Sequence, residues 1–161
     1  MDHTESPHLW RTWLEAHARR FLLFARDQTR SEADAQDVLQ DALVETWRRG
    51  GGRTPDHALV FATIRRRAID LARRNERRDL REQAAPDWFH APAGEPAPDD
   101  ELERAVKALP EHLREVVVLK TWSELTFQQI AETLGIPLNT AASRYRYALE
   151  HLRAALKEVR S

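Results

Sequence analysis

The chain has 161 residues, and its 25 Lys and Arg residues nearly balance its 26 Asp and Glu residues, which leaves a formal net charge of −1 at pH 7. Nucleic-acid-binding proteins are commonly basic, so this balance initially disfavours that class. No apolar run approaches the ~18 residues of a membrane span and no basic segment precedes an apolar one, so we expect neither membrane insertion nor a secretory signal. The absence of cysteine excludes disulfides, Cys-ligated zinc and a thiol nucleophile, and it indicates a reducing, cytoplasmic compartment.

The near-neutral total hides three segments of different charge. Residues 1–81 carry 16 basic and 13 acidic side chains, residues 82–103 carry seven acidic ones and no Lys or Arg, and residues 104–161 carry nine basic and six acidic ones. The stretch 82–100 also has four prolines and one glycine, a composition that cannot bury enough apolar surface to fold. We therefore predict two small domains, 1–81 and 101–161, joined by an extended acidic linker over 82–100. Five glycines and few β-branched runs predict that both domains are all-α.

The first domain is predicted to be a bundle of three helices. Apolar residues recur at helical spacing over residues 8–26 and predict the first helix. Ser31 and Asp34 resemble a capping box that begins the second helix, which Gly50–Gly52 ends. Its predicted buried side consists of Ala35, Val38, Leu39, Ala42, Leu43, Thr46 and Trp47. Its exposed side is acidic and consists of Glu32, Asp34, Asp37, Asp41 and Glu45.

The third helix is predicted to begin with Thr54 as N-cap and Pro55 in the first turn, and to extend to about Arg81. Its apolar side consists of Phe61, Ile64, Ala68, Leu71 and Ala72. The opposite side is an arginine stripe made of Arg66, Arg73, Arg74, Arg77 and Arg81. Guanidinium groups match phosphate oxygens, so this stripe is a candidate surface for a DNA backbone. A solvated helix face balanced by acidic residues is the alternative.

Two short helices are predicted to begin the second domain. Asp99 or Asp100 caps the first, which ends at Leu109, and Pro110 begins the second, which ends at Lys120. A third, more specific pattern follows them.

This pattern is typical of a DNA-binding helix-turn-helix. Thr126 and Gln129 form a capping box, and the helix that they begin ends before Gly135, the expected C-cap. Asn139 is the expected N-cap of a last helix that extends to about Val159. The predicted core consists of Leu125, Ile130, Ala131, Leu134, Ile136, Ala141, Tyr145, Ala148 and Leu152.

The outward side of the last helix carries hydrogen-bonding groups that can contact base edges or phosphates. They are Asn139, Thr140, Ser143, Arg146, Tyr147 and Glu150. Arg144 lies beside the apolar side, where its stem can pack while its guanidinium reaches a phosphate. A plain αα-hairpin is the alternative for this segment.

Three segments carry a family resemblance. DAQDVLQDALVETWRR at 34–49 resembles region 2.2 of bacterial RNA polymerase sigma factors, and FATIRRRAIDLARRNERR at 61–78 resembles regions 2.3 and 2.4. Residues 109–153, with the REV run, the Leu-Gly-Ile-Pro turn and a Ser-Arg pair, resemble region 4. The order of these motifs resembles the small, extracytoplasmic-function (ECF) type of the sigma-70 family, which has no region 1.1 or helical region 3.

The resemblance implies a function in transcription initiation and a division of surfaces. The second helix would bind the clamp helices of the β′ subunit of core RNA polymerase, through Asp37, Gln40, Asp41, Glu45 and Trp47. The third helix and the loop at 50–57 would bind and open the promoter −10 element, through Arg66, Arg73, Arg74, Arg77 and Arg81. The last helix would bind the −35 element in the major groove, through Asn139, Thr140, Ser143, Arg144, Arg146 and Tyr147.

The resemblance also implies further partners. The partner would be core RNA polymerase through its β′ and β subunits, and the linker would pass toward the active-site cleft and the RNA exit path, with Trp88 and Phe89 as candidate contacts. A floppy tether with incidental aromatic residues is the alternative for these two positions. An anti-sigma factor is a further partner that the ECF type implies.

Two rival functions stay open. One is a helix-turn-helix regulator that binds an operator without acting as a sigma factor; a sensing N-terminal domain would need a pocket rather than an acidic helix beside an arginine stripe. The other is a polymerase-bound protein without promoter recognition, because Arg66 and Ala142 depart from residues common in the family. The sequence has no His-Glu-x-x-His motif and no glycine-rich phosphate loop after a strand, so we expect no enzymatic activity, metal or cofactor.

Overall fold

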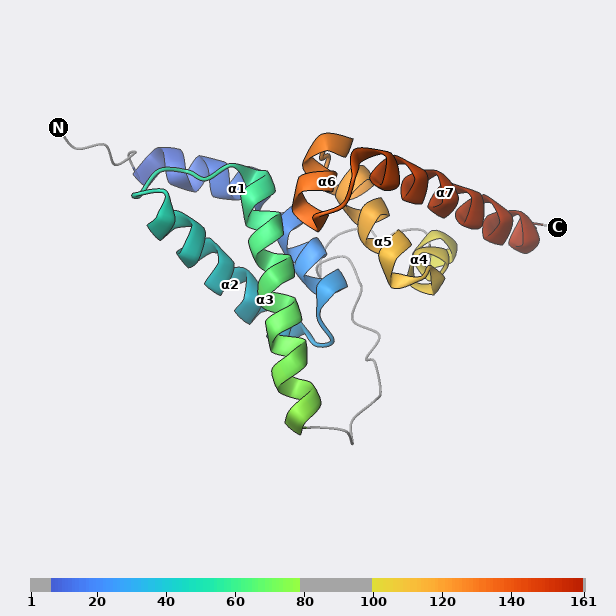
Figure 1. Cartoon of the computed structure of the whole chain (residues 1–161), viewed down its shortest axis with the longest axis horizontal. Helices are drawn as coiled ribbons and strands as arrows, with labels where there is room; N and C mark the ends of the chain where they lie inside the picture. Colours follow the sequence, from blue (N-terminus) through green and yellow to red (C-terminus); the bar gives the residue numbers. More distant parts are fainter. Residues whose placement is uncertain (1–6, 79–99, 161) are drawn as a thin grey trace. The chain divides into compact units, whose positions relative to one another are not determined.

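The computed structural model describes residues 7–78 and 100–160, and every regular element within these ranges is a helix. The helices form two compact units, one containing α1–α3 and the other α4–α7. Figure 1 shows the first unit in blue to green and the second in yellow to red. The predicted all-α fold with two helical parts is confirmed. The linker predicted at 82–100, including Trp88 and Phe89, lies outside the described residues as far as residue 99, and Asp100 begins α4.

The N-terminal unit is a three-helix bundle in which each helix packs against the other two. Its helices are α1 (Pro7–Gln28), α2 (Glu32–Arg49) and α3 (His57–Arg78). Phe61 of α3 is fully buried, and its ring meets Phe21 and Phe24 of α1 edge-on, with centroid separations of 5.0 and 5.6 Å. Ile64 and Ala68 are also buried, as predicted, whereas Ala72 is exposed. The aromatic contacts therefore set which side of α3 faces the core.

Local chemistry explains where the helices begin. The Ser31 hydroxyl accepts a hydrogen bond from the Asp34 backbone N–H at 3.0 Å, which confirms the predicted cap of α2. The predicted start of α3 at Thr54 and Pro55 is wrong. Asp56 is the N-cap instead, because its carboxylate accepts from the Ala58 N–H at 3.2 Å and its carbonyl accepts from the N–H groups of Leu59 and Val60. A carboxylate is favoured there by the positive end of the helix dipole.

An ion pair ties the end of α1 to the start of α2. The largely buried Arg26 donates from Nε and from one terminal nitrogen to the two carboxylate oxygens of Glu32, both at 2.7 Å. The Glu32 side chain is still 44% exposed, so its predicted place on the outer side of the helix holds, but both of its carboxylate oxygens are paired within the unit. Hydrogen bonding from Arg26 holds the pKa of Glu32 below its usual value, so the pair loses its stabilising effect as pH falls through that lowered pKa.

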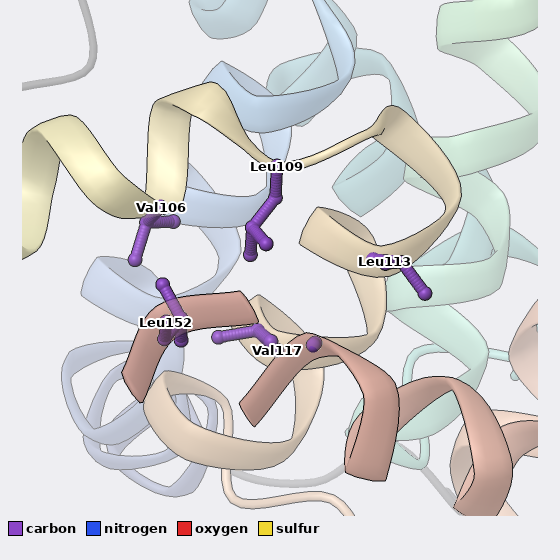
Figure 2. Packing of buried hydrophobic residues seen from close by; sticks show 6 residues of the cluster. Val106, Leu109, Leu113, Val117 and Leu152 are labelled. Atoms are coloured by element: carbon purple, nitrogen blue, oxygen red, sulfur yellow. The ribbon is translucent and has the colours of Figure 1, made fainter. Parts of the chain in front are cut away.

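The C-terminal unit consists of short helices packed on one long helix. They are α4 (Asp100–Ala108), α5 (Glu111–Val117), the π-helix η1 (Val118–Trp122), α6 (Phe127–Leu134) and α7 (Leu138–Arg160). One core cluster joins α4 and α5 to α7 through Val106, Leu109, Leu113, Val117, Ala148 and Leu152. Figure 2 shows these side chains as sticks between the ribbons of the three helices. This cluster fixes the middle of α7, so the first turns of α7 are held at a defined angle.

A π-helical turn replaces the predicted end of α5. An α-helix from Pro110 to Lys120 was the expectation, but the Ser123 N–H bonds to the Val118 carbonyl at 2.9 Å, one residue further back than in an α-helix. The wider turn keeps Leu119 buried. It also brings the Lys120 ammonium to 3.4 Å from the Leu125 carbonyl and over the Phe127 ring. Lys120 thereby fastens the π-helix to the start of α6.

The turn between α6 and α7 has the predicted chemistry. Thr126 and Gln129 form the full capping box, with bonds of 2.9 and 3.1 Å. Gly135 ends α6 in the left-handed conformation, with φ of 67°, where a side chain is disfavoured. The expected N-cap at Asn139 is wrong, because α7 begins at Leu138 and the Ala141 N–H already bonds to the Pro137 carbonyl. Asn139 thus lies inside the first turn of the helix.

Replacing the central aromatic ring tests the N-terminal core. Phe61→Ala is expected to lower the free energy of unfolding of this unit by about 3–5 kcal/mol, because a fully buried ring leaves a cavity. Leu59→Ala on the same helix is the matched control, since Leu59 is 45% exposed, and its effect should stay within about 0.5 kcal/mol. Urea denaturation followed by circular dichroism measures both. Equal losses for the two variants would contradict the assigned core.

Candidate functional site

The acidic surface of α2 is partly as predicted. Asp37, Gln40 and Asp41 are exposed, and Trp47, which the helical pattern also placed on the buried side, is 40% exposed. The sequence interpretation missed Val44, an exposed apolar residue one turn after Gln40 and Asp41. The sequence did contain a signal for it: Val44 lies three residues after Asp41 and seven after Asp37, a spacing that places all three on one side of a helix. Val44 and Trp47, three residues apart, together add exposed apolar area to this otherwise polar side of α2.

Glu45 does not share this outward orientation. It forms an ion pair with Arg66 of α3, and its other carboxylate oxygen lies 3.3 Å from Arg67. Arg67 also lies 3.6 Å from a carboxylate oxygen of Asp41. Two carboxylates predicted to bind a protein and one arginine predicted to bind DNA therefore belong to one network between α2 and α3.

This network lies in a charged groove along the α2–α3 seam. The groove is lined by Asp37, Val38, Asp41, Glu45, Arg49, Arg66, Arg67, Asp70, Leu71 and Arg74. Further along α3, Arg73 and Arg74 are exposed. Arg81 and the side chain of Arg77 fall outside the described residues. The exposed arginines next to the groove keep α3 a candidate for phosphate contact.

Aromatic side chains line the end of the bundle next to the loop that precedes α3. Trp10 stacks on Trp13 at 5.0 Å and meets Trp47 edge-on at 6.4 Å, so α1 and α2 are joined there. Trp13 in turn contacts His17, which stacks almost parallel on His57, the first residue of α3, at 5.2 Å between centroids. The sequence pattern placed His17 only among apolar positions and did not bring these rings together.

Within this pair, the pKa of His17 is shifted. Burial, followed by the nearby His57 and Arg20, lowers the pKa of His17 below its ordinary value of 6.5. Two stacked imidazolium ions would repel each other, so the neutral form of His17 is favoured in the folded unit. Asp56, whose carboxylate is 3.4 Å from His57 Nδ1, is the acidic group beside the pair.

The outward side of α7 agrees with the prediction in part. Asn139, Arg146 and Tyr147 are exposed, while Thr140, Ser143 and Arg144 are half-buried. The Arg146 guanidinium lies 5.4 Å from the centroid of the Tyr147 ring, a cation–π contact that orients it on the surface. Ala141, Ala148 and Leu152 on the other side are buried against the rest of the unit, so the polar side is available to a groove of DNA.

Within residues 7–78 and 100–160, no helix is long and apolar enough to cross a membrane. No group of three or more His, Asp or Glu residues there is arranged to hold a metal ion.

Comparison with known proteins matches both units. Residues 99–152 match the family model described as Sigma-70, region 4. The chain is 31% identical to the ECF RNA polymerase sigma factor RpoE of Cereibacter sphaeroides over 134 residues, which cover 75% of this chain and 71% of that protein. It is 29% identical to the ECF RNA polymerase sigma factor SigL of Mycobacterium tuberculosis, over 94% of this chain and 90% of that one.

A solved structure has a similar fold. It is the sigma factor RpoE from Bartonella quintana, in complex with the anti-sigma factor NepR. The TM-score is 0.72 with 22% sequence identity, and the match covers 91% of this chain and 96% of the other.

Acidification tests the imidazole pair. Because the folded pKa of His17 is lowered, its contribution to stability is complete above about pH 6.5 and is lost as pH falls through the folded pKa. The melting temperature should therefore fall less between about pH 7 and pH 5 in His17→Gln than in the wild type. His112→Gln, at an exposed position of α5, should retain the wild-type slope. A wild-type slope in His17→Gln would show that the pair does not affect stability.

Proposed function

The chain belongs to the ECF RNA polymerase sigma factors of the sigma-70 family, and from this premise we propose how its surfaces divide the work of transcription initiation. The family membership rests on similarity that spans both helical units, including 31% identity to RpoE of Cereibacter sphaeroides. The protein binds core RNA polymerase and promoter DNA and directs initiation. Operator binding without sigma activity is not favoured, because the similarity includes the N-terminal unit as well as the helix-turn-helix.

We assign core binding to the exposed side of α2. In this proposal residues 1–81 form a region 2-like domain, and Asp37, Gln40, Asp41 and Trp47 contact the clamp helices of β′. Val44 lies between these polar residues and supplies apolar contact area. Glu45 belongs to the same predicted set, but its carboxylate is paired with Arg66 and Arg67 of α3. A contact between Glu45 and core polymerase would therefore have to compete with these ion pairs.

We assign −10 recognition to α3 and the loop before it. Arg73 and Arg74 are exposed and available to phosphates, with Arg77 and Arg81 continuing the arginine stripe in sequence. Arg66 belongs to the predicted set but is paired with Glu45. Trp10 and Trp13, at the end of the bundle next to the loop before α3, add flat apolar surfaces of the kind that unpaired bases stack on.

We assign −35 recognition to the outward side of α7 in a region 4-like domain over residues 101–161. Asn139, Thr140 and Ser143 occupy its first turns, where a recognition helix contacts base edges. Arg144, Arg146 and Tyr147 follow along the helix. Arginine bonds the major-groove edge of guanine or a phosphate.

The remaining features complete the proposal. Residues 82–100 link the domains and pass near the β and β′ subunits, and an anti-sigma factor is a proposed partner, since the similar RpoE structure contains one. The protein acts in the cytoplasm with the polymerase. Phosphoryl transfer belongs to the polymerase, so we assign no catalytic residue, metal or cofactor to this chain.

Core binding and initiation test the proposed function together with the α3 assignment. The purified protein should co-purify with core polymerase at moderate salt and direct initiation from at least one promoter of its own genome. Arg73→Ala combined with Arg77→Ala should retain core binding while promoter opening weakens and its salt dependence decreases, because two phosphate contacts are lost. Failure of the wild type to bind core polymerase would refute the function. Loss of core binding in the double variant would refute the assignment of surfaces.

A substitution in α7 tests −35 recognition. Arg146→Ala should weaken binding to the preferred −35 duplex by about 1–3 kcal/mol if its guanidinium bonds a base edge. Arg153→Ala is the matched control, because Arg153 is also exposed on α7 but lies two turns further from the first turn. Fluorescence anisotropy with preferred and scrambled duplexes measures both. An equal loss on every duplex would make Arg146 a phosphate contact.

A further inference from the structure

The first turns of α7 carry exposed apolar side chains among their polar ones. In the described part of the C-terminal unit, Leu138 and Tyr147 are the most exposed large hydrophobic side chains, at 46% and 50%. Leu138 is the first residue of α7 and lies next to Asn139, which is assigned to −35 recognition. Apolar surface is therefore present at the end of the helix whose first residues contact base edges in a helix-turn-helix.

Helical spacing aligns Leu138 with two further positions. Leu138, Ala142 and Arg146 follow one another at intervals of four residues, so they form one row along α7. Ala142 is half-buried and Arg146 is exposed. The whole row lies on regular helix, because the Ala141 N–H already bonds to the Pro137 carbonyl at 3.1 Å. Two apolar side chains thus precede the arginine on the same side of the helix.

The core of the unit keeps this row at the surface. Ala141 and Ala148, on the neighbouring side of α7, are both fully buried. A rotation of α7 that buried Leu138 would expose these two alanines, and a helix has only one side to bury. Leu138 can therefore lose its contact with water only against a bound partner.

The four bases differ in what they offer to such a surface. In the major groove guanine, adenine and cytosine present hydrogen-bonding atoms, whereas thymine presents a 5-methyl group beside its O4. A leucine or alanine placed against a polar base edge removes water from donors and acceptors without replacing their hydrogen bonds, which is unfavourable. Against the thymine methyl, the same side chains bury apolar area on both partners. The row therefore favours thymine and disfavours the other bases.

We propose that Leu138 and Ala142 form an apolar patch that contacts the 5-methyl group of a thymine in the −35 element. This inference rests on the proposed assignment of α7 to −35 recognition. It adds apolar readout to the hydrogen-bonding residues of that assignment, which include neither Leu138 nor Ala142. Because Arg146 continues the row, the contacted thymine lies near the base or phosphate that Arg146 bonds.

Replacement of thymine by uracil tests the patch, because uracil lacks only the 5-methyl group. The full-length protein, bound to core polymerase, selects a preferred sequence from a pool of promoter duplexes randomised over the −35 element. Fluorescence anisotropy at one fixed salt concentration gives its affinity, and each −35 thymine is then replaced in turn. Uracil should weaken binding about fourfold at one or two positions, the effect of burying one methyl group, and less than about 1.5-fold at the others.

Variants connect the sensitive methyl group to the patch through a double-mutant cycle. In Leu138→Ala, uracil at the sensitive position should weaken binding by less than about twofold, because the methyl group has lost an apolar partner. Ala142→Ser places a hydroxyl in the patch and should likewise reduce the effect. Ala154→Ser is the matched control, since it makes the same change at an exposed position further along α7. It should keep the fourfold effect.

The possible outcomes separate the patch from the proposed function. The proposal is overturned if no thymine is sensitive to uracil, or if the preferred duplex has no thymine in its −35 element. An undiminished effect in Leu138→Ala and Ala142→Ser would also overturn it, because another group would then contact the methyl. Circular dichroism checks folding, and Ala142→Ser decides alone if Leu138→Ala does not fold. A wild type that binds core polymerase but selects no −35 sequence would instead refute the assignment of α7, and this inference with it.

Discussion

Burial of Phe61 between two phenylalanines of α1 determines the rotation of α3, and the functional surfaces of the N-terminal unit depend on that rotation. A helix has one side to bury, so once Phe61, Ile64 and Ala68 enter the core the arginines must lie elsewhere. Some of them then point toward solvent and others toward the carboxylates of α2. The same packing contact therefore decides which arginines are free and which are paired.

In the C-terminal unit, the turn between α6 and α7 sets the direction of the outward-facing helix. Gly135 adopts a left-handed conformation that few other residues tolerate, and it redirects the chain from α6 into α7 within a few residues. The cluster around Leu109, Val117 and Leu152 then fixes the middle of α7. Between these two constraints, the first turns of α7 present Asn139 and Arg146 on a stable support. A recognition helix needs this support because its contacts with bases depend on its angle to the groove.

Acidic and basic side chains are concentrated in separate parts of the chain, so the net charge of −1 describes none of these parts. The acidic segment at 82–103 offsets the basic excess on either side of it. Within the N-terminal unit, acidic α2 and basic α3 lie against each other instead of forming independent surfaces. The surface proposed for core binding and the surface proposed for DNA binding thus share one carboxylate, that of Glu45.

Elements that have local causes follow from the sequence alone. Helical periodicity, the caps at Ser31 and Thr126 and the glycine after α6 were sufficient to predict the all-α fold and the helix-turn-helix, and motif order was sufficient for the family. Other features depend on residues distant in the chain, and only the tertiary structure reveals them. They are the pairing of Glu45 with Arg66, the row of aromatic rings from Trp47 to His57, and the π-helical turn after α5. Periodicity reports which side of a helix is apolar, but it cannot report which helix lies opposite a given charge. For that reason the sequence predicted an acidic surface and an arginine stripe, and only the packing of α2 against α3 brought the two into contact.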